Sequence, residues 1–238
     1  MFDIQLKDCM EYMQSMTDNS VALTITDIPY DVVNRSQGNL SKMGSLDKGD
    51  ADVITFDISD FVNEVVRVTK GSIYIFCSTE QAGLIRGQLV DLGLTTRHCI
   101  WEKPDYPPIN GQYFWLSSIE NCIFARKKKA PFNEFCQSVV WQENIERSIK
   151  NHPTPKPVLL MKRLIEASSN EGDTVFDPCM GSGSVGLACK MSGRKFIGCD
   201  INPEYVANAI ERINDLNLDS NPWKKKIDKR MLAVSHNR

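Results

Sequence analysis

Two short stretches, 150 residues apart, contain residue types that suit binding and catalysis. The first, Asp27-Ile28-Pro29-Tyr30, follows the apolar segment VALTI and joins a carboxylate to an aromatic ring through a proline. The second, DPCMGSGS, occupies 177–184. A carboxylate accepts hydrogen bonds, and a ring can stack on a planar ligand. A turn would explain the aspartate and the proline of the first stretch, but it has no need for the tyrosine.

The glycine-rich stretch indicates a ligand-binding turn. Gly181 and Gly183 allow unusual dihedrals and a close approach of the backbone to a ligand. The next strand pattern ends in Asp200, 17 residues after Gly183, where a carboxylate can accept hydrogen bonds from ribose hydroxyls. The spacing Gly181-x-Gly183-x-x-Gly186 also matches a dinucleotide fingerprint, but only 52 residues follow Gly186, too few for a second mononucleotide half. A nucleoside cofactor therefore fits better than NAD.

The elements that must position these residues alternate between strand and helix patterns, which predicts an α/β sheet covered by helices. Strand patterns occur at 2–6, 21–26, 72–77, 95–101, 121–125, 174–177 and 195–199, and helix patterns near 9–16, 59–68, 80–92, 157–168, 185–192 and 203–216. The strands at 95–101 and 121–125 have no helix pattern between them and predict an antiparallel hairpin at the sheet edge. We expect one domain over 1–220 and a basic tail over 221–238.

Composition favours an ordinary globular protein inside a cell. The chain has 238 residues, 42% of them hydrophobic and 24% charged, and no apolar run approaches the roughly 20 residues of a membrane span. Its start has no signal-peptide pattern, so we expect a cytoplasmic protein of a bacterial or phage type, without a membrane partner. Eight cysteines without a CxxC pair and only three histidines predict buried free thiols and no metal site.

Charge is unevenly distributed, although the net charge is only -2. Residues 1–64 contain 12 acidic and 4 basic side chains, whereas 221–238 contain 6 basic and 1 acidic. A further basic run occupies 126–129. Such local excess can mark a surface that binds a polyanion, and solvated lysines are an equally open explanation. The long polar segment 31–52 is of a kind that is usually functional or mobile.

Together these motifs resemble the amino-methyltransferases of DNA. The resemblance rests on DPCMGSGS, on HPTPKP at 152–157 and, far upstream, on TDIPY. Those enzymes use S-adenosylmethionine to methylate an exocyclic nitrogen of adenine or cytosine, and the order seen here is similar to their circularly permuted β class. The resemblance spans 2–216. It implies a single Rossmann-like domain with a seven-stranded, mainly parallel sheet in permuted order.

The same resemblance implies a set of cofactor-binding residues. Asp8 and Cys9 would lie at the cofactor adenine, Asp200 would hold the ribose, and Ile201 would pack on the adenine ring. Thr154 and Lys156 lie in the segment that would close over the cofactor carboxylate, although helix capping and a solvated lysine would also explain them. The full set is Asp8, Cys9, Asp27, Thr154, Lys156, Asp177, Met180, Gly181, Ser182, Gly183, Ser184, Asp200 and Ile201.

The resemblance also assigns chemistry to the first stretch. An exocyclic amine is a poor nucleophile, because its lone pair is delocalised into the ring. Asp27 and the main-chain carbonyl of Ile28 would accept its hydrogen bonds, Pro29 would fix their direction, and Tyr30 would stack on a base flipped out of the duplex. The family motif is usually Asp-Pro-Pro-Tyr, so Ile28 departs from it, which keeps the carbonyl and removes some rigidity.

An aspartate at the first position of this motif usually accompanies adenine-N6 enzymes, which favours adenine in DNA. Methylation of cytosine N4, RNA or a protein amide, and a catalytically impaired DNA-binding relative, remain the alternatives. For phosphate contacts the candidates are Lys103, Arg126, Lys127, Lys128 and Lys129, with the segments 31–52 and 103–154 as candidate DNA-contacting insertions. A homodimer is expected by analogy alone.

Overall fold

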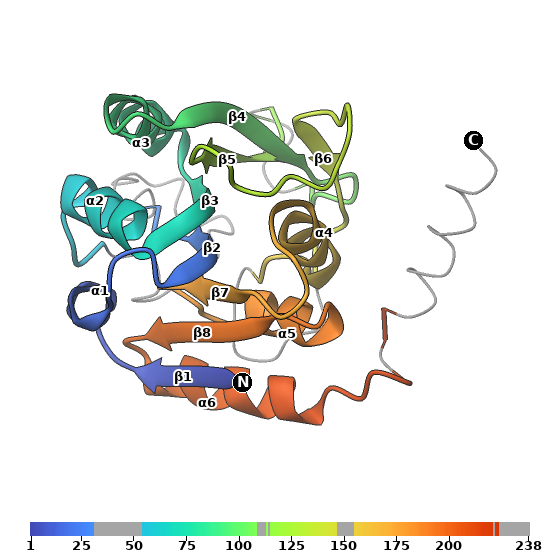
Figure 1. Ribbon diagram of the computed structural model, residues 1–238. Helices are drawn as coiled ribbons and strands as arrows, with labels where there is room; N and C mark the ends of the chain where they lie inside the picture. The colour runs from blue at the N-terminus through green and yellow to red at the C-terminus, as the bar shows by residue number, and fades with distance from the viewer. Residues whose placement is uncertain (31–53, 109–112, 114, 147–154, 221, 224–238) are drawn as a thin grey trace.

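The predicted strands form one mixed sheet in the computed structural model of the chain, which describes residues 1–30, 54–108, 113, 115–146, 155–220 and 222–223 (Figure 1). The strand order is β1-β8-β7-β2-β3-β5-β4-β6. The strands are β1 (Phe2–Leu6), β2 (Val21–Asp27), β3 (Thr69–Cys77), β4 (Thr95–Glu102), β5 (Ile119–Arg126), β6 (Val140–Gln142), β7 (Thr174–Asp177) and β8 (Lys195–Asp200). The helices are α1 (Cys9–Ser15), α2 (Ile58–Val68), α3 (Thr79–Asp91), α4 (Val158–Ser168), α5 (Ser184–Met191) and α6 (Pro203–Asp215).

The α/β class, the permuted order and the mainly parallel sheet are confirmed, but the strand count is not. The described sheet has eight strands, because β6 pairs in parallel with β4 and occupies the edge. The predicted hairpin, β4 with β5, therefore lies one strand inside that edge. A three-residue strand is too short to show the alternation by which strands are recognised in a sequence. Among the described strands only β5 runs antiparallel to its neighbours.

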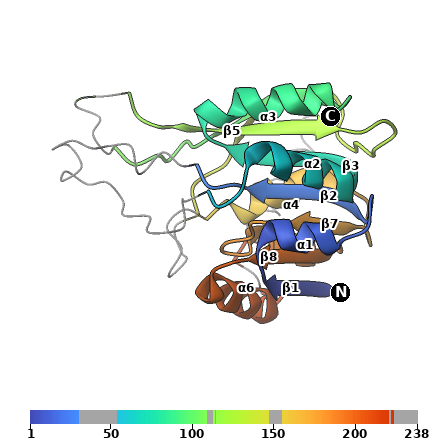
Figure 2. The ribbon, with the colours of Figure 1, turned by 90° about the vertical axis from the view of Figure 1, so that its left-hand side faces the viewer.

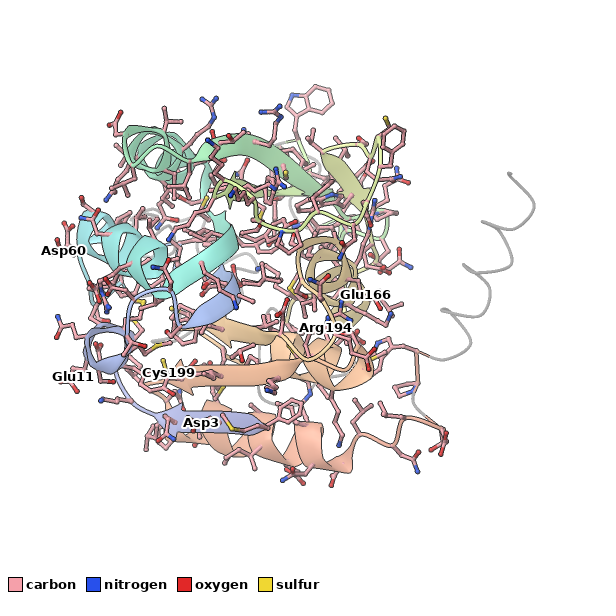
Figure 3. The ribbon with its side chains drawn as sticks, in the orientation of Figure 1. Asp3, Glu11, Asp60, Glu166, Arg194 and Cys199 are labelled. Carbon is pink, nitrogen blue, oxygen red and sulfur yellow. The ribbon has the colours of Figure 1, made fainter. Side chains whose placement is uncertain are left out.

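Helices cover both faces of the sheet. Figure 1 shows α1, α2 and α3 on one side and α4 and α5 on the other, and Figure 2, viewed from the first side, shows α1 and α2 in front of the strands. On the first side Met13, Phe61 and Ile85 are buried in one core, and on the second side Leu164 and Ala188 belong to another. Polar side chains lie on the outer surfaces of α1 and α2: in Figure 3 the exposed side chains of Glu11 and Asp60 point outward from these helices.

Local hydrogen bonds explain why most helices begin where the sequence predicts. The carboxylate of Asp8 accepts from the backbone of α1, and Asn202 accepts from the first turn of α6, where Pro203 is the first helical residue. Ser78 and Gln81 form a capping box at the start of α3. These caps satisfy backbone N–H groups that a helix cannot pair internally.

The eight cysteines are all free thiols, as predicted. Six are buried, Cys179 is half-buried, and Cys136 is exposed, so the expectation of burial is wrong for Cys136, which lies in a loop at positive φ of 49°. None of the helices within the described ranges has the length and apolar character needed to cross a membrane. The predicted segment 31–52 and almost all of the tail 221–238 lie outside the described residues. The predicted insertion 103–154 contains β5 and β6, so part of it belongs to the sheet.

Candidate active site

Three aspartates meet at one edge of the sheet, because each is the last residue of a parallel strand. Asp27 ends β2, Asp177 ends β7 and Asp200 ends β8. A fourth carboxylate reaches the same edge by a different route. Glu120 lies near the start of the antiparallel strand β5. The residue after it, Asn121, pairs with Cys77, the last residue of β3. Four acidic side chains, none closer than 23 residues in sequence to the next, therefore share one edge.

A cavity of about 580 Å³ opens at this edge and joins the two stretches that the sequence singled out. Its volume is that of a typical small-molecule site. The predicted site residues that line it are Asp8, Cys9, Asp27, Ile28, Pro29, Tyr30, Lys156, Asp177, Met180, Gly181, Ser182, Ser184, Asp200 and Ile201. Thr154 lies outside the described residues, and Gly183 does not line the cavity.

The glycine-rich turn is hydrogen-bonded to the carboxyl end of the neighbouring strand β8. The N–H of Met180 donates to the carbonyl of Cys199 at 3.1 Å, and the N–H of Gly181 donates to Oδ2 of Asp200 at 2.9 Å. Gly183 has φ of 74°, and a Cβ there would lie 2.8 Å from the Cβ of Ala209 in α6. Gly183 is therefore needed for the left-handed turn and for close helix packing.

The two acidic residues beside this turn are embedded differently. Asp200 accepts from Gly181 with one oxygen and from the N–H of Asn202 with the other, at 2.9 Å each, so it joins two turns of the cavity wall. Asp177 is 3% exposed, and burial, with the charges of Asp27 and Asp200 adding to it, raises its pKa to about 8 against the hydrogen bond from Cys179 N–H. A neutral buried carboxyl that ionises when a cation arrives suits the ammonium end of an amino-acid-like ligand.

These features fit S-adenosylmethionine. The turn, Asp177 and Asp200 line one cavity, so its wall offers carboxylates that could accept from an ammonium and from ribose hydroxyls, and Ile201 is 55% exposed there. Tyr205, which the sequence did not single out, adds an aromatic side chain to the same wall.

The DIPY stretch is fastened to the sheet and to α3. The N–H of Ile28 donates to the carbonyl of Phe76 at 3.2 Å, a bond that the proline usual at this position could not make. The side chain of Ile28 is 2% exposed and packs in the core with residues of α1 and α2, so it contributes apolar packing of its own. The carbonyl of Pro29 accepts from Nε2 of Gln81 at 2.8 Å, which ties the stretch to the capping box of α3.

Asp27 belongs to a cluster of charged groups that we call the charge cluster: Asp27, Tyr30, Lys103, Glu120 and Lys156. The ammonium of Lys156 donates to Oδ2 of Asp27 and lies 3.0 Å from Oε2 of Glu120. The hydroxyl of Tyr30 also donates to Oε2 of Glu120, at 3.1 Å, and accepts from Lys156 at 3.3 Å. Lys103 pairs with Oε1 of Glu120 at 3.3 Å. Two lysines and two carboxylates thus balance each other around one tyrosine.

The electrostatics of the charge cluster separate its two carboxylates. Burial raises the pKa of Asp27, and the charge of Glu120 raises it further, against the opposing effect of Lys156. Burial alone would also raise the pKa of Glu120, but Lys156 and Lys103 together lower it. Burial opposes the charge on Lys156, yet the two carboxylates raise the pKa of its ammonium, so it stays protonated. The lowered pKa of Glu120 keeps its carboxylate ionised, whereas the raised pKa of Asp27 makes its ionisation more sensitive to neighbouring charges.

One oxygen of Asp27 is available to a ligand. While Oδ2 is bound to Lys156, Oδ1 is buried and has no hydrogen-bond partner within the described part of the chain. A buried acceptor without a partner is costly in a folded protein. Because Asp27 also lines the cavity, Oδ1 is placed to accept from a bound donor.

The structure brings together most of the predicted site but separates the DNA-contact candidates. Lys103 lies in the charge cluster. Arg126 instead pairs in register with Ser72 and Thr95, near the amino ends of β3 and β4, because β5 runs antiparallel. The run 126–129 is therefore at the sheet edge opposite the cavity.

Two members of that run are also engaged within the protein. Nε of Arg126 donates to the carbonyl of Ala130 at 3.1 Å, and the ammonium of Lys127 donates to the carbonyl of Val66 at 2.7 Å. Lys128 and Lys129 are exposed.

Lys156, predicted in the segment that would close over the cofactor carboxylate, lines the cavity, and its ammonium pairs with Asp27 and Glu120. Sequence reasoning missed Glu120 and Gln81. Glu120 lies one residue before the predicted strand 121–125, which begins at Ile119 in the structure, and Gln81 is typical of the first turn of a helix.

The sequence matches a known protein family and several of its members. Residues 21–211 match the family model described as DNA methylase, which covers N6 and N4 methyltransferases. The type II methyltransferase M2.DpnII of Streptococcus pneumoniae is 30% identical over 236 residues, and 87% of each chain is covered. The DNA adenine methyltransferase YhdJ of Escherichia coli is 29% identical over 243 residues, with 87% of this chain and 81% of that protein covered.

Solved structures agree. The crystal structure of M1.HpyAVI in complex with S-adenosylmethionine has a TM-score of 0.68 and 28% identity, covering 89% of this chain and 100% of that one. The cytosine-N4-specific PvuII DNA methyltransferase has a TM-score of 0.69 with 17% identity, covering 92% and 89%, which is a likeness of fold. With the family model matched over most of the chain and the cavity built from the expected motifs, this chain belongs to the N6/N4 family of S-adenosylmethionine-dependent DNA methyltransferases.

Proposed function

We propose that this protein transfers a methyl group from S-adenosylmethionine to the N6 amine of adenine in DNA. Membership of the DNA methylase family supports the reaction class and the methyl donor. Two observations favour adenine: the aspartate at the first position of the DIPY stretch, and the similarity to YhdJ, which is named as a DNA adenine methyltransferase.

The observation that carries the proposal is the position of the Asp27 carboxylate. Its Oδ1 is buried without a partner among the described residues, in the same cavity as the turn around Gly181. An acceptor at this place can take a hydrogen bond from an amine that faces the methyl donor. Only the fold joins these residues, since 150 residues separate Asp27 from Asp177.

The chain's own groups supply activation and orientation. Asp27 and the carbonyl of Ile28 accept from the two N–H groups of the amine, which favours a tetrahedral nitrogen and stabilises the positive charge that develops on it. Pro29, held by Gln81, aims both acceptors. The ring of Tyr30, oriented by its bond to Glu120, offers a stacking surface that offsets part of the cost of unstacking the base.

When bound, S-adenosylmethionine would supply a methyl group on a positively charged sulfur. That sulfur would leave as a neutral thioether as the amine takes the methyl group and releases one proton to solvent. The residues that would hold it are Asp8, Asp177, Asp200, Ile201 and the turn at 180–184. No covalent intermediate on the protein is required, because the amine itself is the nucleophile. Lys103, beside Glu120 and 11% exposed, is the candidate of the DNA-contact set that lies at the site.

The test is direct. Duplex and single-stranded DNA are incubated with the protein and S-adenosylmethionine carrying a labelled methyl group, and the DNA is digested to nucleosides for mass spectrometry. The proposal expects label in N6-methyladenine. Label in N4-methylcytosine would replace adenine by the cytosine alternative, and label in neither nucleoside, with the cofactor demonstrably bound, would contradict the proposed function.

A further inference from the structure

Glu120 touches the catalytic stretch from outside it. It comes from β5, and its carboxylate accepts from Lys156, from Tyr30 and from Lys103 at 3.0, 3.1 and 3.3 Å. Its side chain is 18% exposed and lines the cavity. A carboxylate that is costly to bury and has three donors around it is held in one place.

Lys156 is shared between two carboxylates. An ammonium has three N–H donors, and those of Lys156 face Oδ2 of Asp27, Oε2 of Glu120 and the hydroxyl of Tyr30. Its Nζ also lies 5.3 Å from the centroid of the Tyr30 ring. A base that stacks on Tyr30 and offers its amine to Asp27 therefore enters beside an ammonium that already binds the same carboxylate.

The ammonium and the amine meet different oxygens of Asp27, because Lys156 is bound to Oδ2 while Oδ1 is left for the amine. A cation bound to one oxygen of a carboxylate weakens the other oxygen as an acceptor, and an ammonium paired with Asp27 alone would weaken it most. Glu120 lessens this effect, because it offers Lys156 a second carboxylate within hydrogen-bonding distance. Lys103, on the other oxygen of Glu120, keeps that carboxylate ionised.

We propose that Glu120 is a positioning residue of the methyl-transfer site, which shares the Lys156 ammonium with Asp27 and thereby keeps Asp27 available to the amine of the target base. This inference rests on the proposed function for its effect on the rate. The sharing of the ammonium is a property of the protein alone and can be measured without any reaction.

The test replaces Glu120 by glutamine, which keeps the size and one acceptor but removes the charge. The rate constant for methyl transfer, kcat, is expected to fall roughly 10- to 100-fold because the geometry around Asp27 is disturbed, with the Kd for S-adenosylmethionine unchanged. The pKa of Asp27, followed by NMR of labelled aspartate carboxyl carbons and assigned with Asp27→Asn, is expected to fall, since Glu120 raises it in the wild-type protein.

Two further variants serve as controls. Glu120→Asp keeps the charge and is expected to recover part of the rate, with Asp27 titrating nearly as in the wild type. Glu102→Gln removes a carboxylate from the neighbouring strand β4, where Glu102 accepts from Gln142, and is expected to leave both readouts unchanged.

A wild-type rate in Glu120→Gln would overturn the inference. So would a reduced rate with an unchanged Asp27 titration, because it would show a merely structural role. If the wild-type protein methylated no DNA, the proposed function would fail, yet the titration would still decide: a lowered pKa of Asp27 in Glu120→Gln supports the shared ammonium, and an unchanged pKa overturns it.

Discussion

Replacing Lys156 by methionine tests whether the charge cluster is as tightly balanced as its distances indicate. The side chain of Lys156 is 7% exposed and its ammonium contacts Asp27 and Glu120. Methionine fills similar space but leaves two carboxylates beside each other without their shared cation. Removing one partner of a buried ion pair costs about 3–5 kcal/mol of unfolding free energy, and Lys103, still 3.3 Å from Glu120, places this variant toward the lower end.

The loss should depend on pH in a defined direction. In the wild type the pKa of Glu120 is lowered, so its stabilising effect is present above the ordinary carboxyl pKa and is lost as the pH falls. Without Lys156 the pKa of Glu120 rises, and that of Asp27, already raised in the wild type, rises further, so the variant loses stability relative to the wild type as the pH rises. The difference between wild type and variant therefore grows from about pH 4 to neutrality.

Urea unfolding at pH 5 and pH 7.5 measures this difference. Lys162→Met is the matched control, because Lys162 lies on α4 and its ion-pair partner among the described residues is Glu166, which is 44% exposed. Loss of such a surface pair costs about 0–1 kcal/mol. The double variant Lys156→Met with Asp27→Asn should regain much of the loss, since one of the two carboxylates is gone. Equal stability of Lys156→Met and wild type at pH 7.5, or a difference that does not change with pH, would refute the reasoning.

Three further predictions concern other parts of the molecule. The unfolding free energy of Asp177→Asn should increase relative to that of the wild type as the pH rises from about 4 toward 8, by about 1.4 kcal/mol per pH unit at most. The reason is that the folded wild type retains a proton on Asp177 that its unfolded chain has lost. Parallel pH dependences of the two proteins in denaturant titrations would contradict the neutral carboxyl. Gly183→Ala should lower the unfolding free energy by about 1–3 kcal/mol, through its positive φ and the clash with Ala209, and an unchanged thermal midpoint would count against that packing. Joint replacement of Lys128 and Lys129 by alanine should leave the salt dependence of DNA binding unaltered, because both lie at the edge opposite the cavity; a shallower dependence would place DNA there.

Much of the fold could be predicted because local signals agree with the tertiary arrangement. Asp8, Ser78 and Asn202 mark helix starts by their capping hydrogen bonds, and the apolar runs that end in Asp27 and Asp177 are parallel strands buried on both faces. Once those strands are parallel, their carboxyl ends must share an edge, so the meeting of the two motifs follows from topology.

The parts that could not be predicted depend on partners distant in sequence. The sequence predicts the antiparallel pairing of β5 with β4, but it does not reveal that β5 also pairs antiparallel with β3, and this pairing brings Glu120 to the cavity and carries Arg126 to the far edge. The contacts of Lys156 also depend on partners distant in sequence. Its motif places it in the segment expected near the cofactor, but its ion pairs with Asp27 and Glu120 become evident only in the folded chain.

Ile28 shows how a departure from a motif can be absorbed. Its backbone carbonyl serves in place of that of a proline, while its side chain is buried and its N–H binds the carbonyl of Phe76. The rigidity that a proline would contribute is supplied here by packing and by one hydrogen bond. The carboxylate of Asp27, the preceding residue, cannot be replaced by packing or by a backbone group in this way.

Methyl transfer should depend most directly on the carboxylate of Asp27, and Asp27→Asn tests this. Asparagine keeps the shape of the side chain and removes the charge that activates the amine. Single-turnover transfer from labelled S-adenosylmethionine to DNA should fall roughly 100-fold or more, while the variant stays folded by circular dichroism and still binds the cofactor. Transfer at the wild-type rate by a protein with asparagine at this position would contradict the central claim.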